Sequence, residues 1–425
     1  MIQTDLAVIG SGMAGICAAA FSQDRGICFV QAGLTSELSF ASGCLDLLGI
    51  VPRARPHMVT RPLEDLDRLK QQRPGHPYAV AGTGHIKKGF ETFTAFMEKA
   101  GIPYHIIPGS NQHVITPAGT LKPTYASPLS MAAAHDAISE NKRILIVDIK
   151  GLKGFSSRQM AMGLKGMVPG IKSATVAFPG RENQGDLMCE RLTWDLETPD
   201  ILTQFAARIR PHAENVYAVG IPAILGIYRF EELRQKIERI IKARVFEVPT
   251  LAPSVTGMRI KEAFLGRLSL LGIRHFSSSV TKIDLDRTKK FVFNVSQGLD
   301  RVEVRSDFLI LATGRFMGGG LEAENGLIKE PLFDLPVFQP GHRSQWFSRD
   351  FFDPRGHGVN QAGIETDSGF RPVNSQKQVY HKRLYAAGSI LAHQDWKREK
   401  SGAGISIASA HKAVSAIARE LNNLK

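Results

Sequence analysis

The sequence is poor in cysteine, and the few cysteines that it has are scattered. Its 425 residues contain Cys17, Cys28, Cys44 and Cys189, and no two of them form a Cys-x-x-Cys pair. Scattered cysteines without such a pair argue against a disulfide framework, a zinc site or an iron–sulfur cluster. We therefore expect no metal in this chain, and any electron transfer should end at an organic cofactor.

Long apolar runs are also missing. No stretch approaches the roughly 20 apolar residues that a membrane-spanning helix needs. Residues 4–9 enter a strand pattern directly, without the basic and then apolar segment that is typical of a secretory signal. With 43% hydrophobic and 22% charged residues, the composition is that of a globular protein of two or three domains. We expect it to be cytoplasmic.

Acidic residues are outnumbered, with 40 Asp and Glu against 53 Lys and Arg, which gives a formal net charge of +13. Such an excess fits nucleic acid, an anionic membrane surface, an acidic partner, or merely a solvated basic face. The basic residues are dispersed, and no basic run alternates with aromatic residues. Nucleic acid is therefore not expected, while anionic surfaces stay open as partners.

A glycine-rich turn near the start of the chain is the most informative motif present. Gly10, Gly12 and Gly15 form a G-x-G-x-x-G pattern between an apolar strand and an alanine-rich helix pattern. In dinucleotide sites the first glycine permits a tight turn, the second lets the backbone approach the pyrophosphate, and the third lets helix and strand pack closely. The N–H groups of the helix N-terminus, near Met13 and Ala14, face the anion. The motif predicts a dinucleotide site.

The residue after the second strand pattern departs from the usual fingerprint. Residues 27–30 form this strand, and an acidic residue normally follows it and holds a ribose hydroxyl. This chain has Gln31 there. An amide oxygen can still accept a hydrogen bond from a hydroxyl, so we expect Gln31 to take this role with a weaker, neutral contact.

Further glycine turns indicate which dinucleotide binds. A strand at 308–311 ends in Thr313-Gly314, another at 384–386 ends in Gly388-Ser389, and Gly402 and Gly404 open a last helix. Together they resemble the flavoprotein oxidoreductases of the two-dinucleotide-fold type. In that group the first turn lies near the adenosine half and the second meets the ribityl chain and isoalloxazine, which favours FAD over NAD. The cofactor-binding residues predicted are Gly10, Gly12, Met13, Ala14, Gly15, Gln31, Ser42, Gly43, Thr313, Gly314, Gly388, Ser389, Gly402 and Gly404.

These patterns predict an α/β chain with a Rossmann-like two-dinucleotide-binding flavoprotein fold. An inserted α/β domain and an irregular cap segment interrupt it. Strand and helix patterns alternate within the insert, which favours a parallel sheet there. A helix pattern carries Phe90, Phe93, Phe96 and Met97 on one face, as a packing surface does. We assign 1–75, 251–315 and 381–425 to the flavin domain, 76–250 to the insert, and 316–380 to the cap or partner segment.

Other stretches carry a more specific pattern. They are residues 38–48, 76–78, 116–121, 249–255, 318–321, 350–352, 366–367 with 371–372, and 387–389. In these stretches the chain resembles the B subunit of anaerobic glycerol-3-phosphate dehydrogenase. The similarity runs from end to end and is weakest between about residues 140 and 245.

The resemblance implies a cytoplasmic flavoprotein that pairs with an A subunit, also a flavoprotein. Both dock at the inner membrane on a C subunit that carries iron–sulfur clusters. The complex oxidises glycerol 3-phosphate to dihydroxyacetone phosphate and passes electrons to quinone in anaerobic respiration. The family's B subunit is commonly assigned FMN, whereas the pyrophosphate turn favours FAD, so FMN stays open as the alternative. The helix pattern at 405–421 suits packing, so direct membrane insertion is not expected.

Residues for catalysis are harder to find. Oxidation of a secondary alcohol by a flavin needs a base for the hydroxyl proton and a cation for the phosphate. Arg371, Arg259 and Arg315 are candidate phosphate holders, and His393 is the histidine expected nearest the flavin. Lys400 departs from the family's usual glycine and either stabilises the reduced flavin or points to solvent. No base-plus-nucleophile constellation is visible, which supports an electron carrier more firmly than a catalytic site.

Two other functions stay open: a stand-alone flavin oxidoreductase with its own small substrate, and a flavin-dependent tRNA-modifying protein. The redox subunit predicts an exposed apolar or aromatic patch within residues 315–380. The stand-alone enzyme predicts an enclosed basic pocket over the flavin, and the tRNA-modifying protein predicts a contiguous basic face.

Overall fold

The computed structural model describes residues 1–51, 57–298 and 300–424. The chain folds into two compact units. The first unit comprises Met1–Glu37, Leu45–Met97 and Phe264–Lys425, and the second comprises Leu38–Cys44 and Glu98–Ala263. The long segment of the second unit, Glu98–Ala263, therefore begins later and ends later than the insert that we assigned to 76–250, and residues 316–380 belong to the first unit.

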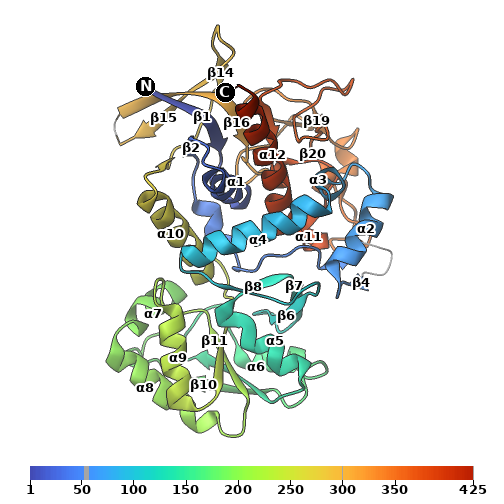
Figure 1. The fold of residues 1–425 in the computed structure, drawn as a ribbon. Helices are drawn as coiled ribbons and strands as arrows, with labels where there is room; N and C mark the ends of the chain where they lie inside the picture. The colour runs from blue at the N-terminus through green and yellow to red at the C-terminus, as the bar shows by residue number, and fades with distance from the viewer. Residues whose placement is uncertain (52–56, 299, 425) are drawn as a thin grey trace. The chain divides into compact units, whose positions relative to one another are not determined.

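A seven-stranded sheet organises the first unit (Figure 1). Its order is β13 (Arg274–Phe276), β2 (Phe29–Ala32), β1 (Ile2–Ile9), β16 (Asp300–Leu311), β15 (Phe291–Gln297) and β14 (Asp284–Leu285), with β21 (Leu384–Ala386) also paired to β16. Strands β13, β2, β1, β16 and β21 are parallel, whereas β14 and β15 are antiparallel additions. The carboxyl ends of β1, β2, β16 and β21 consequently lie at one edge of the sheet.

The apolar runs of the sequence explain the centre of this sheet. The last four residues of β1 and of β16, which include Val8 and Ile310, are buried, as expected for strands covered on both faces. For β16, the sequence pattern predicted a strand only over residues 308–311. In the structure β16 starts at Asp300 because its first half also pairs antiparallel with β15, from Gln297↔Asp300 to Phe291↔Ser306.

Helices α1 (Met13–Asp24) and α12 (Gly402–Leu424) pack against each other beside the sheet (Figure 1). Small buried residues such as Ala18 and Ala410 allow this close contact. Helix α4 (Thr83–Lys99) buries Phe90 and Phe93 on one face, as its spacing predicted. Shorter elements are α2 (Pro62–Gln72), α3 (Pro77–Ala81), α11 (Trp396–Glu399), β3 (Ile50–Val51), β4 (His57–Met58), β17 (Glu322–Glu324), β18 (Leu327–Lys329), β19 (Val337–Phe338) and β20 (Gly363–Ile364).

The second unit contains a four-stranded, fully parallel sheet, as the alternation of strand and helix patterns predicted. Its order is β10 (Lys172–Val176), β9 (Ile144–Ile149), β11 (Ala218–Pro222) and β12 (Arg244–Val248). The helices of this unit are α5 (Ala132–Ser139), α6 (Ser157–Leu164), α7 (Cys189–Leu196), α8 (Pro199–Ile209), α9 (Phe230–Ile241) and the first part of α10 (Val255–Leu270). The strands β5 (Tyr104–Ile106), β6 (Gln112–Ile115), β7 (Leu121–Thr124) and β8 (Ala126–Pro128) form two small antiparallel pairs.

Exposed apolar side chains are numerous between residues 315 and 380. Phe351 and Phe352 are 81% and 89% exposed, and their rings meet edge to face with centroids 4.9 Å apart. The others in this part of the chain are Phe316, Met317, Leu327, Phe338, Phe347 and Tyr380. Among the described residues, no helix is long and apolar enough to cross a membrane.

Candidate cofactor site

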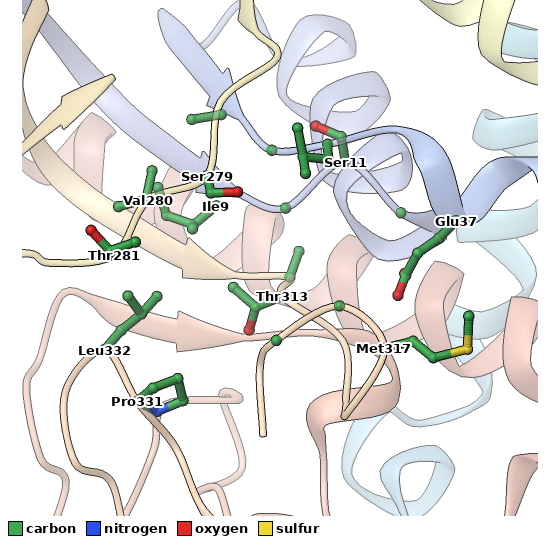
Figure 2. A pocket seen from close by; sticks show the side chains of 18 of the residues that line it. Ile9, Ser11, Glu37, Ser279, Val280, Thr281, Thr313, Met317, Pro331 and Leu332 are labelled. Carbon is green, nitrogen blue, oxygen red and sulfur yellow. The ribbon is translucent and has the colours of Figure 1, made fainter. Parts of the chain in front are cut away.

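A cavity of about 310 Å³ lies where β1, β2 and β16 end, in the first unit (Figure 2). Open α/β sheets bind ligands at this edge, outside the carboxyl ends of the strands. The cavity is lined by Ile9, Gly10, Ser11, Gly12, Ala32, Gly33, Leu34, Glu37, Ser279, Val280, Thr281, Ala312, Thr313, Met317, Gly318, Gly319, Glu322, Pro331 and Leu332. The glycine turn and the Thr313 turn of the sequence thus meet in one place.

Gly10 and Gly15 allow the glycine turn to pack tightly. Gly10 has φ +116°, and a Cβ atom on it would lie 2.2 Å from the carbonyl oxygen of Ala312. A Cβ atom on Gly15 would lie 2.1 Å from the carbonyl oxygen of Gly10. These are the tight-turn and helix-packing roles that the motif assigns to its first and third glycines.

Gly12 precedes the first turn of α1 and faces the cavity. Among the described residues, no side chain caps this helix end, and the first turn has no acidic residue. The neighbouring Ser11 hydroxyl lies 2.9 Å from Nε2 of His275 instead. The first N–H groups of α1 therefore have no side-chain cap, as at helix ends that bind phosphate.

Gln31 is placed differently from the prediction. Strand β2 continues to Ala32, which pairs with Ile9, so Gln31 lies within the strand and is fully buried. Its Nε2 donates to the carbonyl oxygen of Gly10 over 2.9 Å, and it does not line the cavity. Its Oε1 is buried and has no hydrogen-bond partner among the described groups. One acceptor therefore remains beside the glycine turn, and its role toward a ribose hydroxyl stays a prediction.

The two C-terminal glycine turns approach the same region. Thr313 lines the cavity, and its buried hydroxyl has no partner among the described groups. A Cβ atom on Gly314 would lie 3.8 Å from Oγ of Ser389, and one on Gly388 would lie 2.5 Å from Cβ of Ala14. The Thr-Gly turn, the Gly-Ser turn and the start of α1 are therefore neighbours, as the flavoprotein resemblance implied.

Four predicted cofactor residues make other contacts. A Cβ atom on Gly404 would lie 2.2 Å from the Tyr78 hydroxyl, and one on Gly402 would lie 3.1 Å from the Trp396 ring, so both glycines serve packing at the start of α12. Ser42 and Gly43 belong to the second unit. The carbonyl oxygen of Gly43 accepts a hydrogen bond from the Tyr104 hydroxyl there.

Sequence reasoning missed Glu37. Its side chain points into the cavity (Figure 2), and burial raises the pKa of its carboxyl group. The signal in the sequence that could have identified Glu37 is an acidic residue shortly after the second strand. Glu322 is the other carboxylate at the cavity, and the described lining residues include no lysine, arginine or histidine.

Two candidate phosphate-holding arginines are already paired with carboxylates. Arg259 is buried, donates to Oε1 of Glu247 over 2.8 Å, and also donates to the carbonyl oxygen of Gly226. Arg371 donates from Nε to Oδ2 of Asp367 over 2.8 Å. Neither lines the cavity. The structure therefore contradicts Arg259 as a phosphate holder, because its guanidinium is enclosed and neutralised, and it leaves the charge of Arg371 compensated.

Arg315 and Lys400 do not reach the cavity either. The guanidinium of Arg315 donates to the carbonyl oxygens of Val359 and Asn360, and burial lowers its pKa to about 10. Lys400 adopts φ +50°, and its carbonyl oxygen accepts a hydrogen bond from the N–H of Gly49. The structure thus gives both residues a role in holding loops together.

His393 lines a second cavity, of about 410 Å³, which shares no lining residue with the first. Its Nε2 lies 2.8 Å from Oε1 of Glu365, whose other oxygen accepts from Nζ of Lys377 over 2.7 Å. The expectation that His393 is the histidine nearest the flavin cavity is not supported, because the ring nitrogen that contacts a lining residue there belongs to His275.

Comparison with known families shows to which family this chain belongs. A family model described as "FAD binding domain" matches residues 5–405. The chain belongs to this FAD-binding family. The match covers both glycine turns and the cavity between them, and it confirms FAD, the cofactor favoured over FMN from the sequence. This glycine cradle, formed by the turn after β1 and the Thr313 turn, fits FAD. Gly12 keeps the approach to α1 open, and Gln31 and Thr313 each have a buried oxygen atom with no hydrogen-bond partner among the described groups.

Relatives match nearly the whole chain. It is 31% identical over 427 residues to the B subunit of anaerobic glycerol-3-phosphate dehydrogenase from Vibrio vulnificus, covering 97% of this chain and 96% of that protein. It is 29% identical over 440 residues to the probable B subunit of the same dehydrogenase from Halobacterium salinarum, covering 99% of each. The resemblance inferred from the sequence is confirmed.

Solved structures also match over the full length at low identity. The 3-ketosteroid Δ1-dehydrogenase from Sterolibacterium denitrificans matches with a TM-score of 0.43 and 10% identity, covering 99% of this chain and 100% of that one. Quinol fumarate reductase FrdA from E. coli matches with a TM-score of 0.41 and 10% identity, covering 100% of this chain and 71% of that one.

Proposed function

We propose that this chain is the flavin-carrying redox subunit of a membrane-docked anaerobic glycerol-3-phosphate dehydrogenase. The complex oxidises glycerol 3-phosphate to dihydroxyacetone phosphate and passes electrons to quinone. The glycine cradle at the ends of β1 and β16, in a chain similar to B subunits over 97% of its length, carries this proposal. Bound FAD supplies the acceptance and release of electrons. Gly12 and the first turn of α1 bind its pyrophosphate.

The charge of the cofactor cavity supports an electron carrier over a catalytic role. A phosphorylated substrate needs cations, and arginine is the usual choice because it binds phosphate through two hydrogen bonds. The charged residues that line the cavity in the described structure are Glu37 and Glu322. Neither is a cation that could hold the phosphate of glycerol 3-phosphate, so oxidation of this substrate is assigned to a partner subunit.

Partner subunits are supported by the exposed aromatic residues and by the names of the relatives, which are single subunits of a larger enzyme. Phe351 and Phe352 expose large apolar surfaces, which on soluble proteins mark sites of interaction. We propose that they contact the A subunit or the iron–sulfur C subunit. The chain is then cytoplasmic and peripheral at the inner membrane, where its partners hold it.

A second candidate function is a stand-alone flavin oxidoreductase acting on another small substrate. The His393–Glu365 pair favours it, because a histidine oriented by a carboxylate can exchange protons with a ligand in the second cavity. A flavin-dependent tRNA-modifying role has no comparable observation in its favour.

Purification of the tagged chain from native membranes tests the redox-subunit function. We expect FAD, identified by its mass after extraction, and two further subunits, one of which contains iron. Phe351→Ser with Phe352→Ser should reduce recovery of the partners about tenfold or more, since interface aromatics contribute about 2 kcal/mol or more. The matched control is Leu270→Ser, which changes an apolar side chain that is 82% exposed at the end of α10, outside residues 315–380. Recovery of the chain alone from membranes would favour the stand-alone enzyme.

A further inference from the structure

The cofactor cavity contains a carboxyl group where the pyrophosphate is expected. Oε2 of Glu37 lies 3.3 Å from the position that a Cβ atom on Gly12 would take. Oε1 lies 3.0 Å from the corresponding position on Gly318, and Oε2 lies 3.8 Å from that on Gly314. Figure 2 shows the same side chain directed into the cavity. Glu37 therefore occupies the space that glycine leaves open between the turn after β1 and the loop after β16.

The charges around this carboxyl group do not compensate it. Glu322 is the second carboxylate that lines the cavity, and the described lining includes no lysine, arginine or histidine. His275 contacts the turn through the Ser11 hydroxyl, and burial lowers the pKa of its imidazole, which favours the neutral form. An ionised Glu37 beside a pyrophosphate would thus add repulsion in a partly buried site, where charges interact strongly.

We propose that Glu37 holds the pyrophosphate of FAD as a neutral carboxylic acid, donating its O–H to a phosphate oxygen, so that FAD binding takes up a proton. A protonated carboxyl group can donate a hydrogen bond, whereas a carboxylate can only accept. Burial already raises the pKa of Glu37 in the cofactor-free structure, and an adjacent anion raises it further. FAD affinity should therefore fall as pH rises.

Calorimetric titration of the cofactor-free full-length chain with FAD tests this step without any enzyme assay. At about pH 7, in two buffers that differ in ionisation enthalpy, the wild type should take up about one proton per FAD. Its Kd should rise about tenfold per pH unit once Glu37 ionises in the free protein but stays protonated in the complex. Glu37→Gln keeps a hydrogen-bond donor and has no proton to exchange, so its Kd should be nearly independent of pH. Glu214→Gln, which changes an exposed glutamate that does not line the cavity, is the matched control and should keep the wild-type dependence.

The proposal is wrong if the wild type binds FAD with no proton uptake and a flat pH profile, because Glu37 then stays ionised or swings away. It is also wrong if Mg²⁺ restores the affinity lost at high pH, since a metal ion would then bridge the two anions. If Glu37→Gln fails to fold, proton uptake by the wild type still shows whether FAD binding protonates a group of the chain. The inference rests on the FAD site, and wild-type chain that bound no FAD would refute that site itself. Electron transfer within the dehydrogenase is not involved in these measurements.

Discussion

A Cβ atom on Gly10 would lie 2.2 Å from the carbonyl oxygen of Ala312, so the turn after β1 and the end of β16 touch through backbone atoms alone. This contact closes one side of the cofactor cavity. The positive φ of Gly10, +116°, adds a second reason why glycine is required.

The first prediction concerns this contact. Gly10→Ala should lower the free energy of unfolding by about 2–4 kcal/mol, because it adds a steric clash and backbone strain. Gly26→Ala is the control: Gly26 also has positive φ, but no atom lies within 4 Å of its Cβ position. Gly26→Ala should lower the free energy of unfolding by about 1–2 kcal/mol, from backbone strain alone. Chemical denaturation measures both, and equal losses would mean that the contact with Ala312 is not tight.

The second prediction concerns the pyrophosphate site. Gly12→Val should abolish FAD retention while the chain still folds, because the branched side chain fills the cavity in front of α1. Gly84→Val, near the start of α4 and with no neighbour within 4 Å, is the control for replacing glycine by valine near a helix N-terminus. Visible absorbance and far-ultraviolet circular dichroism report the two properties. Full flavin absorbance in purified Gly12→Val would refute the assignment.

Acid should destabilise the first unit through His411. Burial and the nearby Arg25 and His85 lower the pKa of its imidazole from 6.5 to about 3. Between these values the unfolded chain binds a proton that the folded chain does not. The contribution of His411 to stability is therefore complete above about pH 6.5 and is lost as pH falls toward 3, by up to about 1.4 kcal/mol per pH unit.

Thermal unfolding of wild type and His411→Gln between about pH 7.5 and about pH 5 checks this dependence. The variant should lose less stability on acidification than the wild type. His212→Gln, which changes an exposed histidine, should follow the wild type. If the stability of His411→Gln falls in parallel with that of the wild type, His411 is not the group responsible.

The buried pair Arg259–Glu247 should support the second unit instead of binding phosphate. Arg259→Leu leaves the Glu247 carboxylate buried without its partner and should cost about 3–5 kcal/mol. Glu247→Gln added to it should recover part of that loss. Arg229→Leu breaks an exposed pair with Glu232 and should lower the free energy of unfolding far less than Arg259→Leu does. Equal effects at the two arginines, measured by denaturation, would contradict the buried pair's importance.

The isolated chain should bind FAD and yet oxidise glycerol 3-phosphate at least about 100-fold more slowly than the intact complex. The reasons are that no phosphate-holding cation is found at the described lining of the cofactor cavity and that the sequence shows no base-plus-nucleophile constellation. Reduction of an artificial electron acceptor measures both rates. Comparable turnover by the chain alone would show that this chain itself catalyses the oxidation.

Membrane association should depend on partners. Without the A and C subunits the chain should stay in the supernatant with anionic liposomes at about 0.5 M salt, where surface electrostatics are screened. At low ionic strength, where the attraction of its +13 charge to anionic lipid is least screened, we still expect it to remain largely unbound. Sedimentation with lipid that survives the high salt would indicate direct insertion.

The sequence by itself determined the glycine turn after β1 and the central strands of both sheets. Gly10 and Gly15 reveal their turn and packing roles because glycine spacing is a local property of the backbone. The helical spacing of Phe90 and Phe93 likewise identified a buried face before the fold was known. Relationships between neighbouring residues are readable because they depend on short-range geometry.

Tertiary structure decided which distant groups meet. Gln31 was expected at a strand end, but pairing with β1 extends β2 and buries it. Arg259 is typical of a phosphate holder by residue type, but folding brings it to Glu247, a partner that no local pattern reveals. Glu37 carries no motif, and only the meeting of the turn after β1 with the loop after β16 places its carboxyl group in the cofactor cavity. Charge compensation depends on such long-range neighbours, so the chemistry of this site emerges only in the folded chain.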